Sequence, residues 1–181
     1  MPFENLAADT QRALTKLAAA VSTVQPIATK TFAFRTGDLV LRQEPVELVR
    51  RVGDWAGSKG RFVYFVETDA VDGAIEALYL AVSHARETNS DGRKYARLQK
   101  PNHVLYVGSS QGLKMRFREH LGYASKSVFA LQLAHWANVH DAPVRFTAAR
   151  YAQTVSDEIL GALEDQLWSQ LKPMLGRQGR K

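Results

Sequence analysis

Glu164 is an acidic residue in the middle of an otherwise apolar helical face near the C-terminus. At about 100° per residue, Leu160, Leu167 and Leu171 fall within roughly 60° of it on a helical wheel. Burial of an unpaired carboxylate costs several kcal/mol, so a cation or a cluster of hydrogen-bond donors must face this side chain. A glutamate paired with a structural arginine is the alternative interpretation.

Arg116 and His120 are four residues apart and therefore lie on one face of a predicted helix. Leu113 and Phe117 place that face toward the core. Arginine suits a phosphate because its planar fork donates two parallel hydrogen bonds and stays charged at any relevant pH. Taken singly, each residue has a structural alternative, a surface ion pair for Arg116 and a satisfied core histidine for His120.

Tyr64 and Tyr106 stand in the middle of two short apolar segments that predict buried strands. If these strands pair, the two phenols can lie on one face of the sheet, because side chains alternate and cross-strand neighbours are close. Gly108 removes a side chain where the second strand ends, which allows a close approach. The alternative is that both tyrosines are core aromatics with hydroxyls at the rim.

Hydrophobic periodicity, caps and turn residues predict the elements that position these side chains. Helices are expected over residues 4–24, 45–55, 71–85, 111–122 and 127–139, and from the N-cap Ser156 to the residue before Pro173. Strands are expected over residues 61–67, 103–110 and 143–151, with a small hairpin in residues 30–42. Residues 57–60 form the clearest linker, and residues 87–102 are interpreted as an exposed loop.

The composition fits a folded, basic protein. The chain has 181 residues, 45% of them hydrophobic, and carries a net charge of +6 with a pI near 9.7. This charge is expected of a protein that meets a polyanion, although many non-binders are equally basic. Without cysteine, a metal must sit on carboxylate, imidazole or water. Signal-peptide features and apolar stretches of 18 residues are both lacking, so we expect a soluble, cytoplasmic protein with no membrane contact.

The ordered set of motifs resembles the GIY-YIG nuclease superfamily. The set comprises FVY at 62–64, YVG at 106–108, an arginine ten residues after Tyr106, a histidine four further on, and a late-helix glutamate followed by Lys-Pro. The resemblance covers about residues 61–175. It implies an α+β fold with a small three-stranded antiparallel sheet flanked by helices. We expect this nuclease domain in residues 58–181, and in residues 1–57 an N-terminal extension formed by a helix, a small hairpin and a short helix.

The resemblance also implies roles for the five site residues. Glu164 would hold one divalent metal ion, Mg²⁺ or Mn²⁺, and Tyr64 would act as the general base for the attacking water. Arg116 would contact the scissile phosphate, while His120 and Tyr106 orient water and phosphate or assist proton transfer. The role of Tyr64 is demanding because a free phenol has a pKa of about 10.

The sequence departs from the family pattern in three places. Phe62 replaces a glycine of the first motif, and Gly176 and Arg177 stand where an asparagine often follows the Lys-Pro element. The third departure is an insert at about residues 68–102 between the two tyrosine motifs. We expect nucleic acid to be contacted by basic residues, most of them in this insert. They are Arg93, Lys94, Arg97, Lys100 and Lys114.

The predicted function is therefore metal-dependent cleavage of DNA, most simply double-stranded DNA, in restriction or defence, repair or mobile-element processing. One alternative is a catalytically inactive nucleic-acid-binding module of the same fold. The other is a nuclease acting on RNA or on branched junctions. A homodimer is expected if both strands are cut, and the amphipathic helix of residues 4–24 is the candidate contact.

Overall fold

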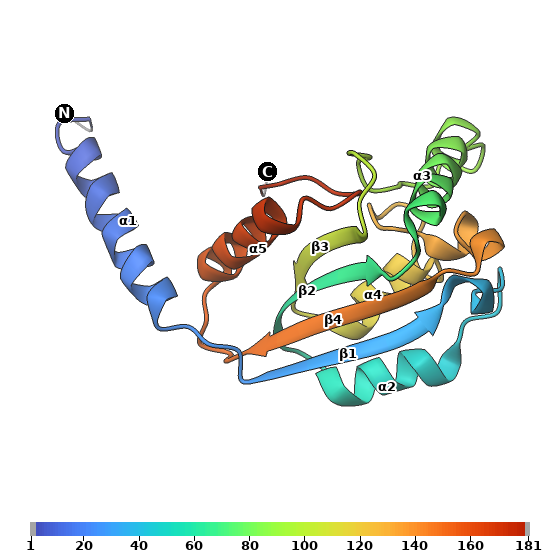
Figure 1. Cartoon of the computed structure of the whole chain (residues 1–181). Helices are drawn as coiled ribbons and strands as arrows, with labels where there is room; N and C mark the ends of the chain where they lie inside the picture. The colour runs from blue at the N-terminus through green and yellow to red at the C-terminus, as the bar shows by residue number, and fades with distance from the viewer. Residues whose placement is uncertain (1–2, 180–181) are drawn as a thin grey trace.

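The computed structural model describes residues 3–179 and confirms the predicted α+β class (Figure 1). The helices are α1 (Leu6–Ser22), α2 (Val46–Ala56), α3 (Asp72–Glu87), α4 (Leu113–Leu121) and α5 (Asp157–Leu171). The strands are β1 (Ala28–Arg35), β2 (Arg61–Thr68), β3 (Val104–Ser110) and β4 (Pro143–Tyr151). Among residues 3–179, no helix combines the length and the apolar character needed to cross a membrane.

One antiparallel sheet holds the four strands in the order β1-β4-β2-β3, so the prediction of three strands is one short. The additional strand comes from residues expected to form a hairpin, and that expectation was wrong. β1 pairs instead with β4, where Phe32 lies opposite Phe146, and both side chains are buried. A 3₁₀ turn at Thr36–Asp38 follows β1 and leads to Leu39, which is buried.

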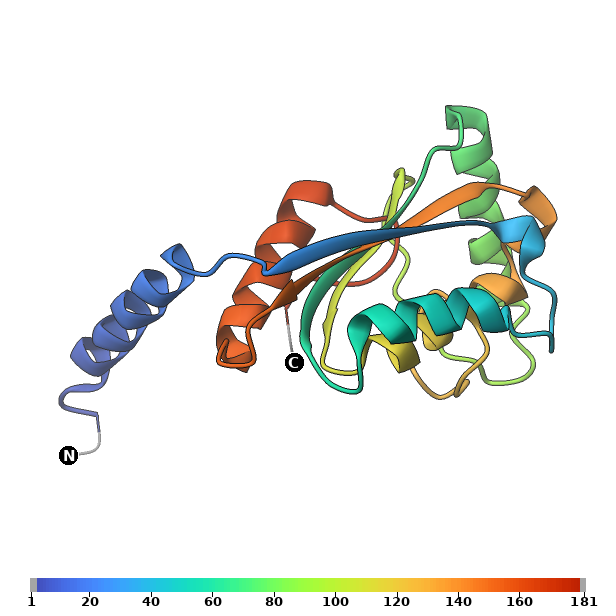
Figure 2. The same cartoon turned by 90° about the horizontal axis from the view of Figure 1, so that it is seen from below.

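The two faces of the sheet carry separate hydrophobic clusters. On one face lie α2 and α4, as Figure 2 shows, and Phe117 of α4 packs edge-on against Phe146 with ring centroids 4.9 Å apart. On the other face, α5 covers Val63 of β2 with Ile159 and Leu160. Side chains from alternate positions of β2 therefore enter different clusters, as the period of two in a strand requires.

β2 and β3 are neighbours, which confirms that the strands bearing the two tyrosines pair. Tyr64 lies opposite Gly108 and Val66 opposite Tyr106. The ladder is regular from Phe62 to Val66 and shifts register only between Val66 and Glu67. The rings of Tyr64 and Tyr106 stack with centroids 6.3 Å apart, so both phenols reach the face that α4 covers.

Two connecting segments differ from prediction. The helix expected over residues 127–139 is replaced by two 3₁₀ turns, Leu133–His135 and Asn138–His140, because Gln132 is buried in a left-handed conformation with φ 59°. The loop at 87–102 is partly tied down rather than freely exposed. Tyr95 bridges to Ala130, and both Tyr95 and Ala96 are buried.

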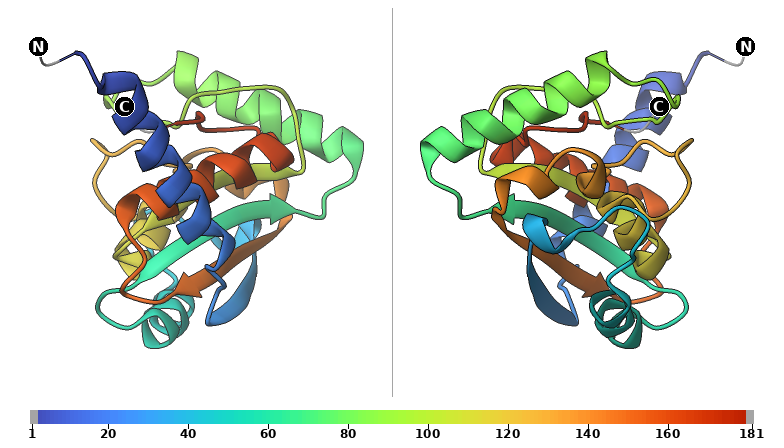
Figure 3. Two further views of the ribbon diagram at one scale, coloured as in Figure 1. Left: turned by 90° about the vertical axis from the view of Figure 1, so that its left-hand side faces the viewer. Right: turned by 90° about the vertical axis from the view of Figure 1, so that its right-hand side faces the viewer.

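α1 projects from the body, as Figures 1 and 2 show, and it crosses α5 in the left view of Figure 3, where the two helices make a few contacts. Its last turns place Leu17 and Val21 against the cluster on the α5 face, whereas Leu6 and Leu14 are exposed. Elsewhere in residues 1–57, β1 and the α2 side chains join the main core. The helix predicted over residues 4–24 is confirmed.

Candidate active site

The guanidinium of Arg116 is the centre of the candidate site. From the first turns of α4, its Nε donates to Oη of Tyr64 at 2.9 Å, and its Nη2 donates to Oη of Tyr106 at 3.0 Å. Glu119, one turn further along, accepts from Nη1 at 2.7 Å, and the carbonyl of Phe129 accepts from Nη2 at 3.1 Å. Four protein acceptors thus fix the plane of one arginine.

The charge of Arg116 is secure. Burial lowers the pKa of the guanidinium, but the oxygens of Tyr64, Tyr106 and Glu119 raise it by more, so the pKa of Arg116 lies above its ordinary value. The side chain keeps 16% of its surface exposed, on the side of the pocket described below. A rigid, permanently charged donor therefore faces a cavity.

Tyr64 and His120 form a buried layer behind this arginine. Their side chains are 0% and 1% exposed, and Oη of Tyr64 lies 2.9 Å from Nε2 of His120. The backbone N–H of Leu131 donates to Nδ1 of the same imidazole at 3.2 Å. A neutral imidazole that accepts at Nδ1 carries its proton on Nε2, so His120 donates to the tyrosine.

Protonation equilibria agree with this arrangement. Burial, together with the charge of Arg116, lowers the pKa of His120 well below its ordinary value of 6.5, so the imidazole is neutral near pH 7. Burial raises the pKa of the Tyr64 phenol, and the charge of Arg116 only partly opposes that rise. Burial thus disfavours the phenolate form of Tyr64, whose side chain is fully buried.

Gly108 makes this packing possible. It lies opposite Tyr64 in the β2–β3 ladder, and the tyrosine side chain passes over it. A Cβ atom on residue 108 would stand 2.6 Å from Oη of Tyr64 and 2.8 Å from the ring of Tyr106. The backbone of β3 thus leaves no room for a side chain between the two phenols.

Glu164 reaches the site from the opposite face of β3. The α5 helix begins at its N-cap Ser156, whose side chain accepts from the N–H of Ile159, as predicted. Glu164, two turns along, is half-buried, and Oγ of Ser109 donates to its Oε2 at 2.5 Å. The donor expected to face this carboxylate is thus a serine hydroxyl, and sequence reasoning did not identify Ser109.

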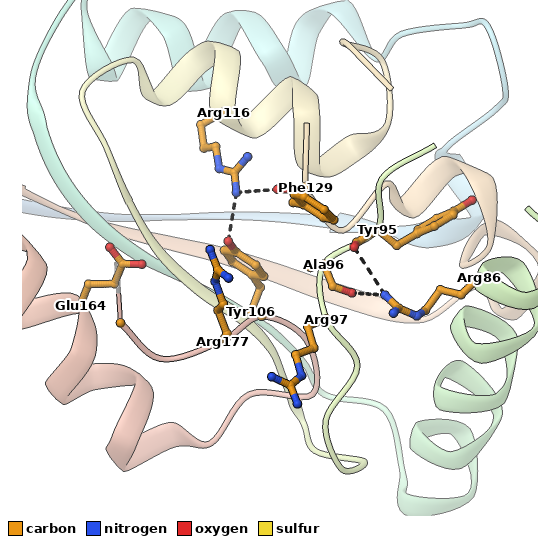
Figure 4. A pocket seen from close by; sticks show the side chains of 11 residues that line it. Arg86, Tyr95, Ala96, Arg97, Tyr106, Arg116, Phe129, Glu164 and Arg177 are labelled. Atoms are coloured by element: carbon orange, nitrogen blue, oxygen red, sulfur yellow. Dashed lines mark hydrogen bonds between the residues drawn. The ribbon is translucent and has the colours of Figure 1, made fainter. Parts of the chain in front are cut away.

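A pocket of about 610 Å³ lies beside the guanidinium of Arg116, at the edge strand β3 (Figure 4). Tyr106, Arg116 and Glu164 line it, whereas Tyr64 and His120 do not. The remaining lining residues are Arg86, Tyr95, Ala96, Arg97, Phe129, Gly176, Arg177 and Gly179. Four arginines against one carboxylate make the pocket strongly cationic, which favours an anionic ligand.

Arg177 is a pocket residue that sequence reasoning noticed only as a departure from the family pattern. The segment that bears it is fixed on both sides, because the N–H of Leu175 donates to the carbonyl of Leu105 at 2.9 Å and that of Gly176 to Arg97 at 2.7 Å. In Figure 4 the Arg177 side chain lies beside Tyr106. Gly176 has φ 111°, which favours glycine, and a Cβ atom there would stand 3.3 Å from the Tyr106 ring, closer than ordinary contact.

The predicted nucleic-acid contacts are dispersed. Arg97 lines the pocket, and Nζ of Lys94 lies 5.4 Å from the ring centroid of Phe129, another lining residue. Arg93 is engaged by other side chains, because it donates a hydrogen bond to Gln132 at 2.8 Å and forms an ion pair with Asp91. The other two are exposed elsewhere, Lys100 at the end of the loop and Lys114 on α4 beside α2. The pocket contains one residue of this set.

At this pocket the described residues offer a divalent ion few protein ligands. Residues 3–179 hold no group of three or more histidine, cysteine, aspartate or glutamate side chains placed to bind a metal. Glu164 offers one carboxylate at the pocket, held by Ser109. Mg²⁺ keeps several waters and is commonly bound through one or two carboxylates plus substrate phosphates, so a single carboxylate suits it.

Comparisons with protein-family models, with curated proteins and with solved structures found no match for this chain. Membership of the GIY-YIG superfamily therefore stays a prediction that rests on the motifs.

Proposed function

We propose that the chain is a metal-dependent endonuclease that hydrolyses phosphodiester bonds in DNA, as its resemblance to GIY-YIG nucleases implies. The observation that carries this proposal is that Tyr106, Arg116 and Glu164, from three separate elements, line one arginine-rich pocket. Arginine favours a phosphate ligand. A carboxylate among phosphate-binding groups would weaken a pure DNA binder by repulsion, whereas a nuclease uses it to hold a cation.

Arg116 is assigned to the scissile phosphate. Its guanidinium is already oriented by Tyr64 and Glu119, so little reorganisation is needed when negative charge develops on the phosphoryl oxygens. The Tyr106 hydroxyl, hydrogen-bonded to Nη2 of Arg116 at the pocket wall, orients the phosphate or the attacking water. A phosphate oxygen can replace this hydroxyl at Nη2.

Tyr64 and His120 are assigned a positioning role. A general base must meet the water it activates, and the Tyr64 side chain is fully buried with its hydroxyl accepting from Arg116 and His120. We therefore assign Tyr64 to holding Nε of Arg116, with His120 fixing the phenol from behind. This replaces the general-base role that the resemblance implies.

Glu164 is assigned to the divalent ion, Mg²⁺ or Mn²⁺, with Ser109 orienting the carboxylate. A bound ion of this kind stabilises charge on the leaving oxygen and lowers the pKa of a water molecule. Arg97 and Arg177 contribute further positive charge to the pocket, where the flanking phosphates of a strand would run. A homodimer, expected if both strands of a duplex are cut, remains a prediction.

Incubation of the purified protein with Mg²⁺ or Mn²⁺ and plasmid, linear, branched and RNA substrates tests the proposal. We expect DNA cleavage that Glu164→Ala abolishes and that Arg116→Ala slows by about 10²–10³, the usual effect of removing one such donor. Glu76→Ala, an exposed glutamate on α3, is the matched control and should be fully active. Binding without cleavage of any substrate would favour the inactive module, and cleavage of RNA alone would favour the RNA nuclease.

A further inference from the structure

Phe129 is a large apolar side chain that is exposed to solvent beside the candidate site. It is 62% exposed, and its carbonyl accepts a hydrogen bond from Nη2 of Arg116 at 3.1 Å. The next residue is tied to the insert, because the N–H of Ala96 donates to the carbonyl of Ala130 at 2.9 Å. The backbone of residues 129–130 is thus anchored on both sides, and Phe129 extends from it close to Arg116.

A second hollow adjoins the ring. It measures about 330 Å³ and is lined by Arg86, Asn89, Gly92, Arg93, Lys94, Tyr95 and Phe129. Phe129, Arg86 and Tyr95 line both this hollow and the larger pocket, so the exposed ring stands where the two meet. Figure 4 shows the ring close to Arg116, with Arg177 beside Tyr106 and Arg97 further along the pocket.

Positively charged side chains line both hollows that adjoin the Phe129 ring. Nζ of Lys94 lies 5.4 Å from its centroid, and Lys94 also lines the second hollow. The larger pocket holds Arg97, Arg116 and Arg177. An aromatic ring between two cationic hollows matches what a single strand of nucleic acid presents, namely flat base faces and a phosphate on each side.

A duplex cannot use this arrangement. Its bases are paired and stacked on one another, so an aromatic side chain meets a base face only where the base is unpaired or extruded. The duplex phosphate backbone could reach the arginines but would leave the Phe129 ring exposed to water.

We propose that the site takes an unpaired nucleotide, with its base stacked on Phe129 and its phosphate at Arg116, so that the substrate is a single-stranded or locally unpaired strand. This inference rests on the proposed nuclease function and specifies its substrate class. A fully paired duplex is then the poorer substrate, and one chain suffices for a cut.

Equilibrium binding in EDTA tests the inference without cleavage. The probes are a fluorescently labelled 15-nucleotide DNA, the same strand annealed to its complement, and an RNA of the same sequence, at one fixed salt concentration. We expect the single-stranded DNA to bind at least tenfold more tightly than the duplex. Phe129→Ala removes the ring on which one base would stack, and it should bind the single strand about 5- to 150-fold more weakly than the wild type does.

Matched variants separate stacking from a general loss of structure. Phe129→Trp retains a flat ring and should bind single strands as tightly as the wild type. Leu80→Ala removes another exposed apolar side chain, on α3, and should change nothing. Thermal unfolding of each variant shows whether the fold is intact.

The outcomes distinguish this inference from the nuclease proposal. Equal or tighter duplex binding, or an equal effect of Phe129→Ala on both DNA forms, overturns the inference even if metal-dependent cleavage is found. Tight, Phe129-dependent binding of the single strand supports it even if no metal yields cleavage, in which case the nuclease proposal fails. RNA binding as tight as that of DNA also supports the inference, because the unpaired base is common to both.

Discussion

Replacing Gly108 by alanine would place a Cβ atom 2.6 Å from Oη and 2.9 Å from Cζ of Tyr64. Ordinary contact begins at 3.4 Å, so the phenol must retreat by about 0.8 Å unless the backbone of β3 moves instead. Tyr64 is fully buried and packs on Phe146 with ring centroids 5.0 Å apart, which leaves it little room. The displacement would reach Arg116, because Nε of that arginine bonds the same hydroxyl.

The expected cost follows from two general magnitudes. Overpacking of a well-filled core costs about 1–3 kcal/mol of unfolding free energy. A misplacement of roughly 1 Å in a catalytic group can lower the rate about 100-fold. Gly108→Ala should therefore remain folded, lose about 1–3 kcal/mol in chemical denaturation, and cleave DNA about 100-fold more slowly at saturating substrate.

Two companion variants make this prediction specific. Gly73→Ala adds a methyl group where nothing lies within 4 Å, and it should leave activity unchanged. Tyr64→Phe removes the atom nearest to the new Cβ, so Gly108→Ala should cost less stability in that background than in the wild type. If Gly108→Ala were as stable and active as the wild type, or equally costly in both backgrounds, a tight Tyr64–Gly108 contact that holds Arg116 would be refuted.

Two further predictions concern charge. Because His120 has a lowered pKa in the folded protein and an ordinary one near 6.5 when unfolded, acid favours unfolding. The free energy of unfolding should fall below pH 6.5 by up to about 1.4 kcal/mol per pH unit more in the wild type than in His120→Gln, measured by denaturation from pH 7 to 5. An identical pH slope in both proteins would contradict a buried neutral imidazole. Arg177→Ala should weaken DNA binding and reduce the salt dependence of log K by about 0.7–0.9, whereas Arg51→Ala, an exposed arginine on α2, should bind as the wild type does.

Local patterns predicted the elements that carry the candidate site. The four-residue spacing of Arg116 and His120 places both on the inner side of α4, because helix geometry alone decides this. The cap at Ser156 starts α5 where expected, since its hydrogen bond spans only three residues. Glu164 proved half-buried rather than enclosed, because the helical wheel shows a direction and does not show where the edge of a sheet lies.

Long-range pairing could not be predicted in the same way. β1 joins β4, whose residues lie more than 100 positions away, and nothing within residues 28–35 identifies that partner. Arg177 enters the pocket because its backbone runs between β3 and the insert, and neither contact has a period in the sequence. The burial of Tyr64 likewise depends on α4 closing over β2. These features arise from packing between distant segments, so local propensity carries no signal for them.

The alternation of β3 has an evolutionary consequence. Successive residues of this strand serve opposite faces, with Ser109 holding Glu164 on the α5 side and its neighbour Gly108 admitting Tyr64 on the α4 side. Insertion or deletion of one residue within β3 would exchange these faces and separate the carboxylate from the arginine in a single event. The strand between Tyr106 and Ser109 must therefore keep its length even where its side chains change, because no compensating shift is open to Arg116, which the carbonyl of Phe129 also holds.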